Sequence, residues 1–178
     1  ARGGVFLSLA VAPFSQALAA AAEGYPTRPI RWIVPFSPGG PSDIIGRFFS
    51  AKLSDALGKQ VVVDNRGGAT GIIAFEIAAH AVPDGYTVLQ AGASGLTTNP
   101  HLHAKLPYDA QRDFRLVTQL VATPNLLVVH ASLPARTVKE LVALAKAKPG
   151  QLAYASGGTG TSNHLSWEML KFYTGIEL

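Results

Sequence analysis

Two Gly/Ser-rich segments constrain this chain most, because each stands between a strand-like run and a helix-like run. The first glycine loop follows the apolar run 30–34 and consists of Phe36, Ser37, Pro38, Gly39, Gly40, Pro41, Ser42 and Asp43. The second glycine loop follows residues 152–155 and consists of Ser156, Gly157, Gly158, Thr159, Gly160, Thr161, Ser162 and Asn163. A helix that begins directly after such a loop directs unpaired N–H groups outward and carries partial positive charge there. The two loops therefore predict a pincer that holds one small anion from both sides.

Strand-like and helix-like runs alternate along the rest of the chain. The periodicity predicts strands at 30–34, 60–63, 86–90 and 151–155, and helices at 41–57, 72–81, 137–148 and 162–174. A third glycine loop, Gly92–Gly95 with Ser94 in it, follows the third strand. Alternation of this kind predicts an α/β fold with parallel sheets flanked by helices. Ligands of such sheets bind beyond the carboxyl ends of the strands, where all three loops are expected.

Composition narrows the class of protein. The 178 residues are 48% hydrophobic and 15% charged, which is typical of a globular chain. The net charge of +4 comes from scattered basic residues, so no nucleic-acid surface is expected. The chain has no Cys, so the fold does not rely on disulfides. We predict neither a metal site nor a cofactor, and we expect a monomer.

The first 22 residues resemble a secretory leader in composition. Arg2 precedes the apolar run 5–12, and small residues in an A-x-A pattern follow up to Ala22. The apolar run is too short to span a bilayer. We therefore expect a signal peptide at 1–22, cleavage near Ala22 and a periplasmic mature protein. A buried Ala-rich helix is the alternative for this segment.

Three nucleotide or hydrolase motifs fail at a residue that their mechanism requires. Asn163 stands where the third glycine of a dinucleotide loop belongs, and Thr161 stands where a phosphate loop needs Lys. Gly95 comes one position too early for a nucleophile elbow around Ser94. An exported hydrolase that uses Ser94 or Ser156 remains an alternative, with His164 as its base, but no acid is placed to orient that histidine.

Several stretches of the chain are similar to one known family. They are YPTRPI (25–30), VPFSPGGPSD (34–43), VVVDNRGGATG (61–71), PDGYTVL (83–89), LPYD (106–109), the 133–141 segment and YASGGTGTSNHL (154–165). In this order they resemble the Bug/TctC family, the periplasmic solute-binding proteins of tripartite tricarboxylate transporters. The likeness covers essentially everything after residue 22.

The resemblance implies a two-domain, hinged clamshell of the periplasmic-binding-protein kind that captures a small carboxylate for membrane transporter subunits. The ligand would be a dicarboxylate, a tricarboxylate, an amino acid or an aromatic acid. The domains would be 23–122 and 123–178, the second one incomplete, with hinge closure about residues 119–125. Such a family holds the carboxylate with backbone N–H groups, hydroxyls and waters. Carried over residue by residue, the ligand-binding positions are Phe36, Ser37, Pro38, Gly39, Gly40, Asp43, Ser94, Ser156, Gly157, Gly158, Thr159, Gly160, Thr161, Ser162 and His164.

Some of these positions carry two interpretations. Asp43 either complements the positive end of the first helix or faces a part of the ligand other than its acid group. Phe36 is either a core residue or an apolar wall, and His164 either donates to the anion or is solvated. A receptor that senses a carboxylate for a membrane signalling partner needs the same clamshell, so it remains an alternative to transport.

Overall fold

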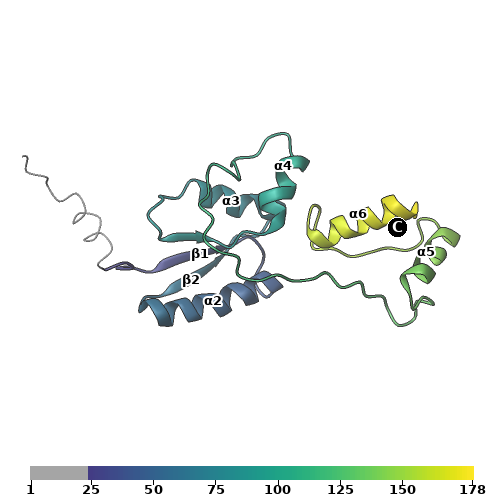
Figure 1. Cartoon of the computed structure of the whole chain (residues 1–178), viewed down its shortest axis with the longest axis horizontal. Helices are drawn as coiled ribbons and strands as arrows, with labels where there is room; N and C mark the ends of the chain where they lie inside the picture. The colour runs from purple at the N-terminus through teal and green to yellow at the C-terminus, as the bar shows by residue number, and fades with distance from the viewer. Residues whose placement is uncertain (1–23) are drawn as a thin grey trace, which may run out of the picture.

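The computed structural model describes residues 24–178, and its N-terminal part is built on a small parallel sheet (Figure 1). The sheet contains β1 (Ile30–Val34), β2 (Val61–Asn65) and β3 (Thr87–Leu89) in the order β2-β1-β3. All pairings are parallel, with Ile30 beside Val61 and Arg31 beside Thr87. The α/β prediction with a parallel sheet is confirmed, and the predicted leader at 1–22 lies outside the described residues.

Helices cover both faces of this sheet (Figure 1). Helix α2 (Pro41–Leu57) begins with a proline, whose missing N–H costs nothing at a helix start, and ends at Gly58 with φ +63°. Helix α3 (Ile72–Ala79) follows β2. Helix α2 connects β1 to β2, and α3 connects β2 to β3 on the other side of β1. Because such parallel crossovers are right-handed, two that run in opposite directions across the sheet place α2 and α3 on opposite faces.

The core forms where α2 packs against β1. Trp32 and Val34 of β1 are buried, and Phe49 and Leu53 of α2 pack against the cluster that these two residues form with Ile30 and Val61. A Cβ on Gly46 would lie 2.9 Å from Val34 Cγ2, so the absence of a side chain there lets the helix approach the strand closely. The helix and strand that position the first glycine loop are therefore held tightly together.

The third glycine loop is a packing element, which corrects the expectation of an open loop. Ser94 begins a π-helical turn, η2 (Ser94–Thr98), which continues into α4 (Asn99–Leu102). A Cβ on Gly95 would lie 2.1 Å from the ring of Phe75. The ring of Phe75 in turn stands 5.0 Å from that of Tyr108. Gly95 is therefore required because the helical turn lies directly on this aromatic cluster.

The C-terminal part contains α5 (Val138–Ala147) and α6 (Ser162–Thr174), which are reached through an extended segment from 115 to 130. The predicted strand at 151–155 is wrong: in the described part of the chain no neighbouring strand pairs with it, so its backbone stays extended without a ladder. Ser162 is the first residue of α6, and Thr161 takes the N-cap position with φ −71° and ψ 158°.

The start of α5 resembles a capping box, in which side chains at the helix start bind free backbone N–H groups. Glu140 donates its N–H to Thr137 Oγ1 at 3.2 Å. Its carboxylate accepts from the N–H of Arg136 at 2.6 Å, one residue before the position that such a box uses. No helix within residues 24–178 combines the length and apolarity that a membrane span requires.

Candidate functional site

The two glycine loops, far apart in sequence, share one cavity. It has a volume of about 210 Å³ and is lined by Pro35, Phe36, Ser37, Gly67, Gly68, Thr70, Gly71, Gly157 and Gly158. Three segments form it: the loop after β1, the loop after β2 (residues 66–71, here called the β2 loop) and the second glycine loop. The cavity therefore lies beyond the carboxyl ends of β1 and β2, where parallel sheets bind their ligands.

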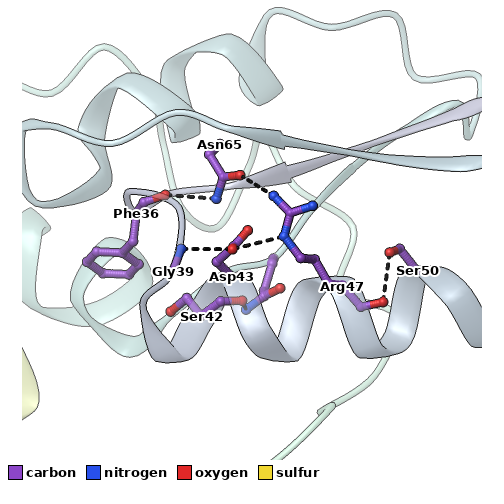
Figure 2. A network of polar contacts seen from close by, with 8 residues as sticks. Phe36, Gly39, Ser42, Asp43, Arg47, Ser50 and Asn65 are labelled. Carbon is purple, nitrogen blue, oxygen red and sulfur yellow. Dashed lines mark hydrogen bonds and ion pairs between the residues drawn. The ribbon is translucent and has the colours of Figure 1, made fainter.

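In the first glycine loop, a carboxylate of the chain itself occupies the start of α2 (Figure 2). Asp43 Oδ2 accepts from the N–H of Gly39 at 2.9 Å and from Arg47 Nε at 2.9 Å. These hydrogen bonds, from Arg47 first and then from Gly39, lower the pKa of Asp43 to about 2. Asp43 is only 4% exposed. The N–H of Gly39 is thus paired with an internal anion in the first turn of α2.

Arg47 continues this network to the strand edge (Figure 2). Its guanidinium donates to Asn65 Oδ1 at 3.5 Å, and Asn65 Nδ2 donates to the carbonyl of Phe36 at 3.1 Å. Asn65 ends β2 and Phe36 follows β1. The network therefore fixes the loop after β1 against the end of β2, and it holds the cavity wall in place.

Other polar groups of the wall remain available to a ligand. Within residues 24–178, no protein hydrogen bond uses the N–H of Ser37, Gly67 or Gly68, or the hydroxyl of Ser37. Ser37 and Gly67 lie close together, since a Cβ on Gly67 would be 3.1 Å from both the nitrogen and Oγ of Ser37. This part of the wall thus offers several uncharged donors within a short distance.

In the second glycine loop, the N–H groups of the three glycines make long hydrogen bonds within the loop and its helix start. Gly157 donates to Asn163 Oδ1 at 3.4 Å and Gly158 to Ser156 Oγ at 3.3 Å. Gly160 donates to the Nδ1 of His164 at 3.4 Å. The two N–H···O distances exceed the usual 2.7–3.2 Å range, and the distance from Gly160 to the ring nitrogen is also long. A ligand oxygen in the cavity can therefore replace the acceptors of Gly157 and Gly158 at small cost.

The structure separates the sequence-predicted positions into two groups. Phe36, Ser37, Gly157 and Gly158 line the shared cavity. The others do not line it: Pro38, Gly39, Gly40, Asp43, Ser94, Ser156, Thr159, Gly160, Thr161, Ser162 and His164. Ser94 is placed in η2, and Gly40 is the N-cap of α2. The glycine loops thus contribute mainly backbone, together with one hydroxyl and one aromatic ring.

Sequence reasoning missed the contribution of the β2 loop. Gly67, Gly68, Thr70 and Gly71 line the cavity, although none of them is among the predicted ligand-binding positions. The same rule that placed the other loops also applies here, because this glycine-rich segment follows a strand of the same parallel sheet. The position of a loop after a strand was therefore the informative feature.

The walls of the cavity are uncharged. None of its lining side chains is charged, so it contains no arginine clamp. In the described part of the chain, no histidine bonds the hydroxyl of Ser94 or Ser156, and no three candidate metal ligands cluster. Within those residues the arrangement offers hydrogen bonds to a ligand and no nucleophile–base pair.

Comparison with known proteins supports the family resemblance seen in the sequence. Residues 45–178 match the family described as "Tripartite tricarboxylate transporter family receptor". The chain is 42% identical over 156 residues to a UPF0065 protein of Pseudomonas sp. strain P51, covering 88% of this chain and 46% of that protein. It is 36% identical to protein BugT of Bordetella pertussis, covering 98% of this chain and 53% of BugT.

Solved structures agree with the fold. A structure of R. palustris Rpa4515 with adipate has a TM-score of 0.83 at 37% identity, and MatC from Rhodopseudomonas palustris with bound malate has 0.78 at 29%. The periplasmic binding protein BugD has 0.71 at 33%. Each comparison covers 86% of this chain and 51–52% of the other. The chain thus spans about half the length of the relatives that it matches, and it belongs to the TctC family of tripartite tricarboxylate transporter receptors.

Proposed function

We propose that this chain is part of a periplasmic solute-binding protein that captures a small carboxylate and delivers it to membrane subunits of a tripartite transporter. The observation that carries the proposal is the shared cavity, in which Ser37 of one glycine loop and Gly158 of the other face one volume of about 210 Å³. Two structural neighbours, named with adipate and with malate, support a small dicarboxylate as the ligand class.

The cavity offers uncharged hydrogen-bond donors that can bind a carboxylate without an arginine. The N–H groups of Ser37, Gly67 and Gly68 and the Ser37 hydroxyl supply donors on one side, and Gly157 and Gly158 supply them on the other. Hydrogen bonds to a charged acceptor contribute roughly 1.5–3 kcal/mol each. A few of them reach micromolar affinity, which corresponds to about 8 kcal/mol.

Capture would follow from closure of the two parts of the chain on the ligand. We assign 23–122 to one domain and 123–178 to another, with the hinge at 119–125. The segment from 115 to 130 has no regular secondary structure, which suits a hinge. We infer that the cavity binds its ligand without transforming it, because in the described residues no nucleophile–base pair faces the cavity.

A calorimetric titration of the purified full-length protein that contains this chain tests this function. Malate and adipate are the acids, and adipamide is the neutral control of the same length. The proposal predicts saturable binding of at least one acid, with a rise in the melting temperature, and binding of the amide at least tenfold weaker. Absence of binding by both acids, or equal affinity for adipate and adipamide, contradicts it.

A further inference from the structure

The β2 loop contains a strained turn at the cavity wall. Ala69 has φ +46° and Thr70 has φ +53°, and both lie in the left-handed region although neither is glycine. A β-branched residue such as Thr70 is rarely found there. Strain of this kind persists only where surrounding contacts impose it, and it clusters at ligand sites and switches. The contacts around Thr70 therefore indicate what the strain serves.

A buried amide holds the turn from below. Asn99 is fully buried, and its Nδ2 donates to the carbonyl of Thr70 at 3.3 Å and to the Tyr108 hydroxyl at 3.4 Å. The Tyr108 hydroxyl donates its own proton to the carbonyl of Gly95 at 2.7 Å, so it acts as an acceptor toward Asn99. Because both neighbours on that side are acceptors, the amide orientation of Asn99 is determined. The turn is thereby tied to the aromatic core.

The strained turn also contacts the second glycine loop. Thr70 Oγ1 donates to the carbonyl of Thr159 at 3.0 Å, which joins residues 89 positions apart. Gly160 packs beside this contact, and a Cβ there would lie 2.8 Å from Leu102 Cδ1. The second loop therefore approaches the first part of the chain closely at the point where Thr70 reaches it.

We propose that Thr70 is a positioning residue for ligand retention. Asn99 holds the turn at Thr70 in the left-handed conformation, and the Thr70 hydroxyl fastens the second glycine loop over the cavity. We call this chain of contacts the Thr70 latch. The inference rests on the proposed function for its effect on a carboxylate, but the latch itself is a contact between two parts of the protein. Its loss would speed ligand release more than it slows ligand entry, since entry occurs while the loop is open.

The experiment compares Thr70→Val with Thr70→Ser in the full chain. Valine keeps the branched shape and removes the donor, whereas serine keeps the donor. Thr70→Ala gives a second reading without the branched side chain, and circular dichroism confirms that each variant is folded. Hydrogen exchange of the 157–161 amides is measured without ligand, and the dissociation rate of malate or adipate is measured by stopped flow with whichever acid binds.

Loss of one hydrogen bond predicts exchange about three- to tenfold faster in Thr70→Val and Thr70→Ala, with Thr70→Ser within about twofold of the natural chain. Ligand dissociation should rise by the same factor, with the association rate nearly unchanged. Equal exchange in all four chains overturns the latch. Absence of carboxylate binding by the natural chain, with the exchange difference intact, overturns the proposed function and supports the latch.

Discussion

Asp43 Oδ2 lies 2.9 Å from the main-chain nitrogen of Gly39, so the first glycine loop is closed on an anion that belongs to the chain. The positive end of α2 is therefore neutralised before any ligand arrives. This relationship shifts the expected ligand contact from Gly39 to Ser37, Gly67 and Gly68, whose N–H groups have no hydrogen-bond partner within residues 24–178. It also makes the stability of the loop dependent on pH.

The pH dependence of unfolding follows from the sign of the Asp43 shift. Its folded pKa of about 2 lies below the ordinary aspartate pKa of 3.8, so its contribution to stability is complete above pH 3.8 and is lost as the pH falls toward 2. We expect the natural chain to lose more unfolding free energy than Asp43→Asn across this window, as measured by urea titrations at stepped pH. Asp55→Asn, at an exposed position of the same helix, controls for net charge. Parallel profiles for the natural chain and Asp43→Asn would contradict the contact.

Gly67→Ala should block the cavity without unfolding the chain. The new Cβ would stand 3.1 Å from both the nitrogen and Oγ of Ser37, which covers the donors that we assign to the ligand. We expect carboxylate affinity to fall at least tenfold, which is about 1.4 kcal/mol. Gly92→Ala is the matched control, since its Cβ has only an ordinary 3.9 Å contact with Ser94 Oγ. Calorimetry that gives equal affinities for the two variants would place the ligand elsewhere.

Gly39→Ala and Gly158→Ala should differ in binding although both glycines adopt a positive φ, which alanine disfavours. Both glycines have positive φ, +82° and +116°, and neither would meet an atom within 4 Å of a new Cβ. Each substitution should cost about 1–2 kcal/mol of stability. Only Gly158 lines the cavity, so only Gly158→Ala should weaken carboxylate binding, by about tenfold. If Gly39→Ala weakened binding as much, the amide held by Asp43 would have to be a ligand donor.

Ala69→Gly should stabilise the fold, because glycine adopts the observed φ of +46° without steric cost. The relief of about 1–2 kcal/mol is partly offset by the greater freedom of glycine in the unfolded chain, which leaves a gain of about 0.5–1 kcal/mol. Ala78→Gly, inside α3, is the control and should lose about 1 kcal/mol. Denaturant titration measures both, and a loss of stability in Ala69→Gly would mean that the turn is not strained.

The sequence predicted the elements whose causes are local. Residues Ile30–Val34 form β1, and Pro41 and Gly58 mark the start and end of α2 as expected. The anion-site argument also predicted that the two glycine loops face one ligand volume, and the shared cavity agrees with that arrangement. Which atoms contact a ligand stays a prediction.

Features that depend on distant partners were not predictable in this way. Residues 151–155 have a strand-like pattern, but a strand exists only where another supplies its ladder. The helical turn at Ser94 depends on the packing of Gly95 against Phe75, which no local pattern shows. The wall formed by Gly67 and Thr70 depends on the pairing of β2 beside β1.

The central claim is that uncharged donors of the two glycine loops and the β2 loop hold the acid group. An amide-resolved NMR titration of the natural chain with malate or adipate tests it most directly. We predict saturable shifts of the N–H signals of Ser37, Gly67, Gly68, Gly157 and Gly158, with much smaller shifts at Gly39, whose N–H is held by Asp43. Saturable binding that shifts Gly39 and leaves the signals of Ser37 and Gly158 unmoved would contradict the claim.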